Sequence, residues 1–429
     1  MTIERDDAGE ALLGGVRLTE LLEGGKIATP AYVYDLDGMR AEARDLRAGF
    51  GASPHLVAFA VKANSAGPVI RALASEGCGA DVVSGAELEL ALACGVEPEQ
   101  IVFSGVAKLD EELDFALTRG PNGILAVQVE SVEEIPRVEA RARSLGRRAR
   151  VSLRINPGIE AETHAYIATG HDEAKFGIPK SEIERAIDAL REASHIDLLG
   201  VSSHIGSQLT STDAYLTAAR MLLPLATLCE AALGKALAFV DFGGGFGVDY
   251  GPGCSVKPRD FASLVAALCR ETRREDLRIV VEPGRSLVAA HGVLCAKVIM
   301  EKCARPSEAT REWLMIDAGM NDLLRPALYQ AFHRIEPIDV APPQLGEGRI
   351  MRVVGPVCES SDDFGNHAMP IAPIKRVVIR DVGAYGFTMA SEYNGRVLPT
   401  EVFVEGGNVV CVIAPRSKSE WIRTRLGRA

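Results

Sequence analysis

Short apolar runs of β type alternate with longer stretches of helical period along the first two thirds of the chain. The helical stretches carry Ala, Leu, Glu and Arg, with apolar positions three or four residues apart. Apolar strands that alternate with helices predict parallel β-α units, because each parallel connection needs a crossover and the helices cover the sheet. We expect eight strands, at Leu56–Val61, Ala80–Val83, Ile101–Phe103, Ile124–Val127, Val151–Ile155, Leu198–Ser202, Ala238–Phe242 and Arg278–Val281.

Helices are expected between most of these strands. Eight strand–helix units within residues 56–281 match one closed (β/α)8 TIM barrel. An open doubly wound sheet is the rival, but it should carry a dinucleotide fingerprint after its first strand, and Lys62-Ala-Asn-Ser-Ala-Gly67 is not one. The expected helices are Ala66–Ser75, Gly85–Ala93, Leu109–Leu117, Val132–Leu145, Lys180–Glu192, Thr212–Leu233 and Asp260–Arg273.

The pattern changes after Arg285, where strand-like runs follow one another with turns and few helices between them. This texture predicts a separate antiparallel β domain over residues 286–429, beside a barrel of residues 38–285. The segment Pro30–Tyr34 precedes the barrel, and we expect residues 1–37 to add a strand to the β domain. The strand-like runs are Val293–Met300, Trp313–Ile316, Arg349–Val354, Arg376–Arg380, Val402–Val404 and Val409–Val412.

The composition is that of a soluble globular protein, with 47% hydrophobic and 24% charged residues in 429. A net charge of −11 argues against a nucleic-acid partner, because such binding depends on cationic neutralisation of phosphates. Nine scattered cysteines without a Cys-x-x-Cys pair favour a reducing cytosol over a disulfide framework or a zinc site. No histidine pair has the spacing of metal ligands. The acidic segment Met1–Glu10 lacks a hydrophobic run for export or anchoring, so we expect a cytoplasmic protein without a membrane partner.

Chemically useful residues follow four of the expected strands, and the loops after the strands build the active site of such a barrel. They are Lys62, His204, Gly243-Gly-Gly245 and Glu282-Pro-Gly-Arg285. By itself Lys62 is a charged residue that ends a strand at the surface. At the catalytic end of a barrel, partial desolvation lowers the pKa of a lysine and frees its amine to form a Schiff base with an aldehyde.

Each of the other three features has a structural and a functional interpretation. Gly243–Gly245 is a tight turn or, with Arg285, a phosphate cradle after strands seven and eight. Glu282 forms a core salt bridge, or it keeps a pyridine nitrogen protonated and so makes the ring a stronger electron sink. His204 is a buried histidine, or a flat ring among small neighbours on which a cofactor stacks. An amine, a phosphate cradle and a carboxylate together indicate pyridoxal 5′-phosphate.

Several segments in order along the chain resemble the fold-type III pyridoxal-phosphate decarboxylases. They are Ala60–Asn64, Gly79–Ser84, Lys175–Ile178, His204–Gln208, Gly243–Gly245 and Glu282–Arg285. Segments of the C-terminal half narrow the resemblance to the diaminopimelate decarboxylase family, and they are Asp317–Tyr329, Cys358–Ser360, Gly383–Phe387 and Met389–Ser391. The similarity runs from about Pro30 to Val404.

The resemblance implies an alanine-racemase-like barrel with a β domain, and a homodimer whose active sites are shared across the interface. It implies that Lys62 carries the cofactor, that His204 stacks on its ring, and that the partner subunit's Cys358 is the proton donor. The cofactor-binding residues that it implies are Lys62, Asp81, His204, Ser207, Gly244, Gly245, Glu282, Pro283, Gly284, Arg285 and Tyr385. Those implied for the distal end of the substrate are Arg285, Arg325, Tyr329, Glu359 and Tyr385. A distal amino-acid end needs cations for its carboxylate and an anion for its ammonium, which agrees with this set.

The activity that the resemblance implies is decarboxylation of meso-2,6-diaminopimelate to L-lysine and CO2. The first alternative is a same-fold decarboxylase of another amino acid, or of a carrier-bound glutamyl or amino-acyl group. Arg285 and Arg325 together speak against substrates without a second carboxylate. A racemase needs a second base opposite Lys62, and a catalytically silent homologue is expected to lose Lys62 or Cys358.

The chain departs from the family pattern at several places, and none of the departures removes an expected catalytic group. Ser361 stands where the family usually has Gly, and Val106-Ala-Lys108 replaces Asn-Gly-Lys. Ser202-Ser203 precedes His204, and Glu392–Arg396 differs from the usual Asn-Tyr-Asn-Ser-Arg. These departures leave room for a relative with a specialised substrate.

Overall fold

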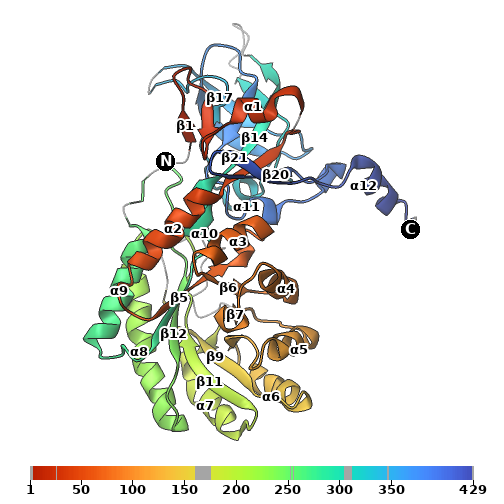
Figure 1. Ribbon diagram of the computed structural model, residues 1–429. Helices are drawn as coiled ribbons and strands as arrows, with labels where there is room; N and C mark the ends of the chain where they lie inside the picture. Colours follow the sequence, from red (N-terminus) through yellow and green to blue (C-terminus); the bar gives the residue numbers. More distant parts are fainter. Residues whose placement is uncertain are drawn as a thin grey trace. The chain divides into compact units, whose positions relative to one another are not determined.

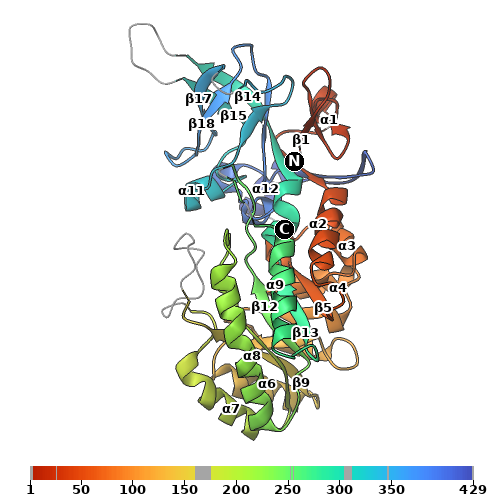
Figure 2. The ribbon, with the colours of Figure 1, turned by 90° about the vertical axis from the view of Figure 1, so that its left-hand side faces the viewer.

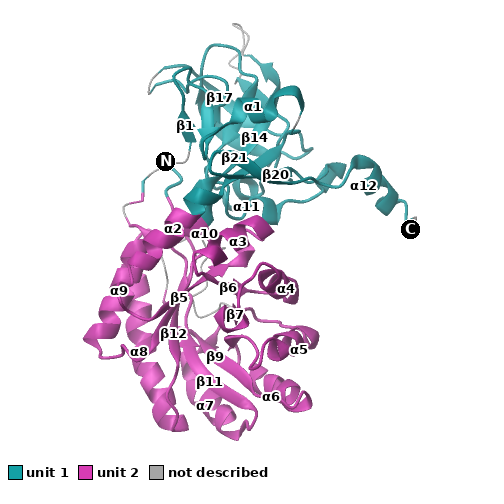
Figure 3. Ribbon diagram, in the orientation of Figure 1, with its two compact units in different colours: residues 1–39, 249–253, 288–429 teal, residues 40–248, 254–287 magenta. Residues whose placement is uncertain are grey.

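The computed structural model describes residues 3–25, 27–159, 175–251, 253–254, 256–303, 312–344 and 347–427. The chain forms two compact units (Figure 3). One contains residues 40–248 and 254–287, and the other contains residues 1–39, 249–253 and 288–429. We refer to them as the barrel unit and the β unit. The domain boundaries expected after residues 37 and 285 stay predictions.

The barrel unit contains a closed barrel of eight parallel strands. The strand order is β9-β11-β12-β13-β5-β6-β7-β8, and a parallel pairing of β8 with β9 closes the ring. Each strand begins and ends within two residues of its prediction, so the barrel expected from the apolar pattern is confirmed. The strands are β5 (His55–Ala60), β6 (Gly79–Val82), β7 (Ile101–Phe103), β8 (Ala126–Val129), β9 (Ala149–Asn156), β11 (Ile196–Ser202), β12 (Phe239–Gly244) and β13 (Arg278–Glu282).

Helices follow the strands and surround the barrel (Figure 1). Their ends agree with local chemistry: Ser84 caps the first turn of α4 by accepting the Glu87 amide, and Pro258 begins α9. The helix α8 ends where Gly234 adopts a left-handed φ of 63°. These helices are α3 (Gly67–Ser75), α4 (Gly85–Ala93), α5 (Asp110–Thr118), α6 (Glu134–Ser144), α7 (Ile183–Glu192), α8 (Asp213–Leu233) and α9 (Pro258–Glu271).

The helix α8 is 21 residues long and apolar enough to cross a membrane by length and composition alone. In the structure it connects β11 to β12 and contacts both strands. Figures 1 and 2 both show it beside α9, where Tyr215 packs edge-on against Phe261 with ring centroids 5.2 Å apart. We therefore interpret α8 as a crossover helix of the barrel, whose apolar residues serve this packing.

The strands of the barrel carry two kinds of buried side chain. An apolar cluster includes Leu56, Val102 and Phe239. Polar side chains lie in the same strands, and Asp81 of β6 and Asp241 of β12 are fully buried. Buried polar groups need hydrogen-bond partners, so we expect a network of polar side chains in the barrel interior.

The β unit is built on a mixed sheet, in the order β18-β17-β15-β14-β4-β20-β21. The predicted N-terminal strand is confirmed as β4, which lies between β14 and β20. The expectation of an antiparallel domain is wrong in two pairings, since β4 with β20 and β15 with β17 are parallel. The strands are β4 (Ala31–Asp35), β14 (Gly292–Lys302), β15 (Trp313–Ile316), β17 (Arg349–Val354), β18 (Asp363–Met369), β20 (Thr400–Glu405) and β21 (Asn408–Ile413).

Smaller elements complete the β unit. The strand β19 (Arg376–Ile379) pairs with β14 and with β16 (Ile335–Pro337). The N-terminal residues form a small antiparallel sheet, and their apolar side chains join a core cluster with Val33, Val293 and Val402. The remaining elements are β1 (Ile3–Arg5), β2 (Ala11–Leu13), β3 (Val16–Arg17), α1 (Leu18–Leu22), α11 (Arg325–Tyr329) and α12 (Lys418–Arg425). Two further helices, α2 (Leu36–Ala48) and α10 (Arg285–Val288), contain residues of both units.

Candidate active site

Lys62 lies on a short 3-10 turn, Val61–Ala63, directly after β5. Its Nζ is 2.7 Å from Oδ2 of Asp81, which is fully buried at the neighbouring strand β6. The other oxygen of Asp81 accepts a hydrogen bond of 2.6 Å from the Ser104 hydroxyl. The Lys62 side chain is 37% exposed, so its amine is accessible while Asp81 holds it in place.

His204 follows β11 and is oriented by Gly243–Gly245 at the end of β12, which we call the glycine loop. The Gly244 amide donates a hydrogen bond of 3.1 Å to Nδ1 of His204, so Nδ1 is an acceptor and the ring proton resides on Nε2. Burial, together with the positive charges of Arg154 and Lys62, holds the pKa of His204 well below its usual range. The side chain is therefore a neutral, flat ring.

The glycine loop lies against the loops that follow β11 and β13. A Cβ at Gly244 would lie 1.9 Å from the Glu282 carbonyl oxygen, and one at Gly245 would lie 2.1 Å from the Gly206 carbonyl oxygen. Gly245 also has a φ of 90°, in the region that favours glycine. These positions require glycine because three backbones meet here.

Arg285 and Ser207 come together at the same end of the barrel. The Nη2 atom of Arg285 donates a hydrogen bond of 2.9 Å to the Ser207 hydroxyl. Arg285 begins α10 and is buried. The preceding Gly284 lies close to the turn of Lys62, since a Cβ there would be 3.0 Å from that of Ala63. The structure thus brings together the predicted phosphate residues of the loops after β11 and β13.

Glu282, at the end of β13, is part of a buried carboxyl pair. The Gln128 amide donates hydrogen bonds of 2.7 Å to Glu282 and 2.9 Å to Asp241. The two carboxyl groups therefore share one amide donor in the barrel interior. Burial and the negative charges of Asp241 and Asp81 raise the pKa of Glu282 well above its usual range.

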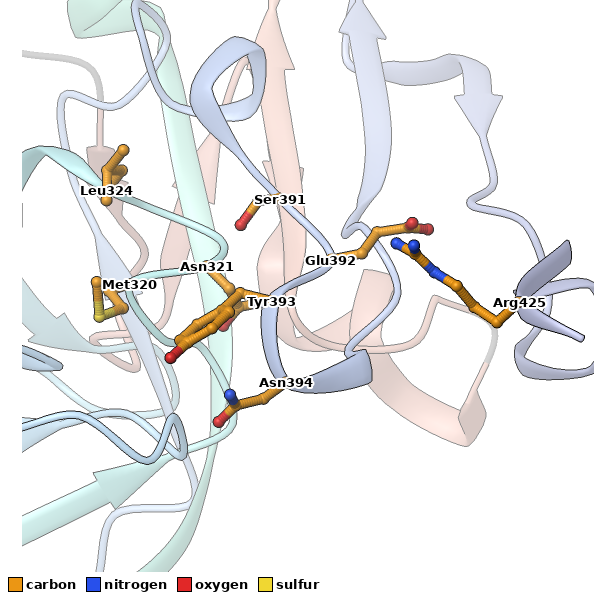
Figure 4. A pocket seen from close by; sticks show the side chains of 8 residues that line it. All are labelled: Met320, Asn321, Leu324, Ser391, Glu392, Tyr393, Asn394 and Arg425. Carbon is orange, nitrogen blue, oxygen red and sulfur yellow. The ribbon is translucent and has the colours of Figure 1, made fainter. Parts of the chain in front are cut away.

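Cys358 and Glu359 lie in the β unit, on an exposed loop between β17 and β18. The Cys358 amide donates a hydrogen bond of 3.0 Å to Oδ1 of Asn394. The Tyr393 hydroxyl donates one of 2.5 Å to Oε1 of Glu359. Both partners line a pocket of about 560 Å³ (Figure 4). Its lining residues are Met320, Asn321, Leu324, Ser391, Glu392, Tyr393, Asn394 and Arg425.

Arg325 and Tyr329 are one helical turn apart on α11, so they lie on the same face of that helix. Nη1 of Arg325 is 2.8 Å from Nε2 of His333, and its guanidinium lies 4.6 Å from the ring centroid of Tyr250. Because the other ring nitrogen of His333 donates to the Arg380 carbonyl oxygen, Nε2 is free to accept from Arg325. The guanidinium is thereby held in a defined orientation.

The structure therefore assembles part of the expected site and leaves part of it as prediction. Lys62, Asp81, His204, Ser207, Gly244, Gly245, Glu282, Pro283, Gly284 and Arg285 all lie at one end of the barrel unit, at or just after the ends of its strands. Arg325, Tyr329, Cys358, Glu359 and Tyr385 belong to the β unit, and Tyr385 has an unusual positive φ of 56°. The roles of all these residues stay predictions.

Comparison with known proteins identifies the family. Residues 36–289 match the model of the pyridoxal-dependent decarboxylases, pyridoxal binding domain. The diaminopimelate decarboxylase of Pseudomonas aeruginosa is 40% identical over 401 residues, which are 92% of each chain. The chain belongs to the diaminopimelate decarboxylase family. The solved diaminopimelate decarboxylase of Helicobacter pylori, complexed with L-lysine, matches with a TM-score of 0.86 and 37% identity over 95% of this chain and 99% of that one. The enzyme from M. jannaschii, in co-complex with L-lysine, gives 0.88 and 33% over 99% and 97%.

The residues of this family member fit pyridoxal phosphate, the cofactor that the matched pyridoxal binding domain implies. Pyridoxal phosphate presents an aldehyde, a basic ring nitrogen and a phosphate. The barrel offers the Lys62 amine, the Glu282 carboxyl group with its raised pKa, and a glycine loop near Ser207 and Arg285. The tight backbone packing at Gly244 and Gly245 excludes side chains from these two positions, so none of the glycine loop obstructs an anion near Ser207 and Arg285. We find no feature of this donor set that conflicts with the cofactor.

Polar residues within the strands of this decarboxylase were not among the residues predicted from the sequence. Gln128 and Asp241 support Glu282, and Arg154 of β9 forms a buried ion pair of 3.0 Å with Glu130. The sequence carries one signal for them, namely a charged or amide residue inside an otherwise apolar run, as in Val240-Asp241-Phe242. A polar group there needs buried partners, and those partners are its neighbours across the barrel.

Proposed function

We propose that this enzyme, an amino-acid decarboxylase by family, removes one carboxyl group of meso-2,6-diaminopimelate and yields L-lysine and CO2. The observation that carries the proposal is 40% identity to the Pseudomonas aeruginosa diaminopimelate decarboxylase over 92% of both chains. The L-lysine in the complexes of the Helicobacter pylori and M. jannaschii enzymes is the product that this reaction predicts. The geometry of the barrel unit supports the same chemistry.

Pyridoxal 5′-phosphate is the cofactor in this proposal, and the barrel residues divide its parts among them. The Lys62 amine would hold the aldehyde carbon, and Asp81 orients that amine at 2.7 Å. His204 would stack on the ring, and Glu282 would interact with the ring nitrogen. The residues that would bind the phosphate region are Ser207, Gly244, Gly245, Pro283, Gly284, Arg285 and Tyr385. Bound there, the cofactor supplies an electron sink for the pair of electrons that CO2 leaves behind.

The chain's own residues orient the substrate and move protons. Lys62 would hold the cofactor between turnovers. Glu282 with its proton keeps the ring nitrogen in the electron-withdrawing form. The partner subunit's Cys358 gives a proton to the Cα atom that has lost its carboxylate. Its amide is held by Asn394, so the loop that carries this thiol has a defined conformation.

The distal end of the substrate determines specificity in this proposal. Arg285 and Arg325 take its carboxylate, Glu359 takes its ammonium, and Tyr329 and Tyr385 complete the site. His333 fixes the direction of the Arg325 guanidinium, which suits a carboxylate that two nitrogens bind at once. Binding at the far end orients the reacting bond, and such positioning supplies a large part of catalysis.

The proposal includes a homodimer and a cytoplasmic location. A shared site follows from the assignment of Cys358 to the partner subunit. All nine cysteines lie among the described residues and are free thiols, which suits a reducing compartment.

The test is a substrate panel with purified protein and added pyridoxal phosphate. Release of CO2 and of the amine product is measured with meso-diaminopimelate, ornithine, arginine and lysine, and the Lys62→Ala variant is the matched blank. We expect equal amounts of L-lysine and CO2 from meso-diaminopimelate and poor turnover of the others. Comparable turnover of ornithine, or activity with a carrier-linked amino acid alone, would replace the substrate and leave the cofactor chemistry standing.

A further inference from the structure

Gln128 lies in the middle of β8 with its side chain inside the barrel, and it is 1% exposed. From there it reaches two strands on the other side of the ring. Its Nε2 atom donates to Oδ2 of Asp241 on β12 at 2.9 Å and to Oε1 of Glu282 on β13 at 2.7 Å. The Gln128 amide thus donates one N–H group to each of the two carboxyl groups.

The position of Gln128 is fixed from its backbone as well. Its carbonyl oxygen accepts a hydrogen bond of 2.6 Å from the ammonium of Lys108, which is itself buried. Its strand pairs with β9, where it lies opposite Ser152. The amide therefore meets the carboxyl pair from a rigid strand rather than from a loop, which is the arrangement that a finely positioned group requires.

Both negative and positive side chains act on the carboxyl groups of Glu282 and Asp241. Asp81 adds a third carboxyl group near both Glu282 and Asp241, while Lys62 acts on Glu282 and Arg154 acts on Asp241 from the positive side. In addition, the Gly243 amide donates a hydrogen bond of 2.9 Å to Oδ1 of Asp241. The Gln128 and Gly243 N–H groups favour the ionised form of the carboxyl groups to which they donate. The neighbouring carboxylates favour the protonated form of Glu282.

We propose that Gln128 and Asp241 are positioning residues that set where the proton resides between Glu282 and the ring nitrogen of the cofactor. This inference rests on the proposed binding of pyridoxal phosphate and goes beyond it, because it assigns the control of ring protonation to two residues behind Glu282.

The proton balance explains the assignment. Burial and the neighbouring carboxylates raise the pKa of Glu282, which favours its protonated form before the cofactor binds. On binding, the O–H bond of Glu282 breaks and an N–H bond forms at the ring nitrogen, so no proton has to come from solvent. The Gln128 N–H group stabilises the carboxylate that is left, and this favours the proton on the ring. Asp241 acts in the opposite direction, because a second negative charge beside Glu282 raises its affinity for the proton.

The experiment measures the ring nitrogen itself. Each variant is reconstituted with pyridoxal phosphate labelled with ¹⁵N in the ring, and the ¹⁵N chemical shift reports whether that nitrogen is protonated. Cofactor affinity is measured by spectroscopic titration. The variants are Gln128→Leu, Gln128→Glu and Asp241→Asn, and Gln100→Leu is the matched control, since it removes a glutamine outside the site.

We expect a protonated ring nitrogen in the unmodified enzyme and in Gln100→Leu. Gln128→Leu and Gln128→Glu should both move the shift toward the unprotonated value, with a loss of cofactor affinity on the order of tenfold. Asp241→Asn should leave the nitrogen fully protonated, since it removes the competing charge and keeps an oxygen for Gly243. A general loss of structure would reduce protonation at both positions, whereas the inference expects the loss in the Gln128 variants and not in Asp241→Asn.

An unchanged shift in Gln128→Glu, or the same displacement in Asp241→Asn as in the Gln128 variants, would overturn the inference. The glutamate variant keeps the size of the side chain and secures the test if the leucine variant fails to fold. Failure of the unmodified protein to bind pyridoxal phosphate would instead refute the proposed function, so the two failures are distinguishable.

Discussion

Replacement of Lys108 by methionine tests how the loops around the site are held. The Lys108 ammonium is buried behind the loop after β7, where the family usually has Asn-Gly before this lysine. It donates to the carbonyl oxygens of Gly105 and Gln128, each at 2.6 Å, and to Oε1 of Glu134 at 3.0 Å. Its side chain is 1% exposed, so solvent cannot replace these three bonds.

The structure sets the size of the expected effect. Methionine fills the volume of the lysine stem but leaves two carbonyl oxygens and a buried carboxylate without their donor. Breaking one side of a buried ion pair in this way costs about 3–5 kcal/mol of unfolding free energy. Lys235→Met is the matched control, because Lys235 binds Asp197 at 2.6 Å with its side chain 54% exposed. Such a surface pair contributes about 0–1 kcal/mol.

Differential scanning calorimetry of the two apo variants separates these values. For a domain of this size, 1 kcal/mol shifts Tm by about 2–4 °C. We therefore expect Lys108→Met to lower the transition of the barrel by roughly 6–20 °C, and Lys235→Met by less than about 4 °C. Equal transitions for the two variants would refute the reasoning that the buried lysine holds the loops.

Three further predictions concern the site. Gly244→Ala should abolish cofactor binding, measured by absorbance titration, because its Cβ would lie 1.9 Å from a backbone oxygen of Glu282. Gly67→Ala should bind normally, since its Cβ would meet the flexible end of Arg71 at 3.2 Å and the Cys94 sulfur at an ordinary contact distance of 3.6 Å. Inactive Lys62→Ala and Cys358→Ala variants should regain up to about a quarter of the sites when mixed, since one hybrid interface has both groups intact; a mixture that stays inactive after demonstrated subunit exchange contradicts the shared site. Arg325→Leu should weaken turnover of meso-diaminopimelate by several kcal/mol in kcat/KM with a normal cofactor spectrum, and an altered spectrum would show that Arg325 serves the cofactor instead.

The barrel was predictable because its strands are buried on both faces and therefore read as continuous apolar runs. The strand β18 (Asp363–Met369) was not predicted, since polar residues such as Asn366 alternate with its buried positions. The parallel direction of β20 relative to β4 could also not be predicted from the local pattern of apolar and polar residues. The two segments meet from opposite ends of the sequence, and no turn between them fixes their orientation.

The candidate site divides in the same way. Lys62, His204 and Glu282 could be found because they follow apolar strands, and the topology of a barrel places strand ends together. Gln128 and Asp241 lie inside their strands, where the sequence shows a polar residue but no partner. Gln128 contacts Glu282, which is 154 residues away along the chain, and Asp241, which is 113 residues away. Only the closed barrel brings these residues together.

The central claim is that Lys62, at the end of the first barrel strand, carries pyridoxal phosphate. Reduction of the reconstituted enzyme with borohydride fixes the cofactor covalently to the amine that holds it, and peptide mapping by mass spectrometry locates the label. We predict a pyridoxyl group on the peptide that contains Lys62, at one per chain, and its loss in Lys62→Ala. A label on a different lysine, or no label on a protein that binds the cofactor, would contradict the account.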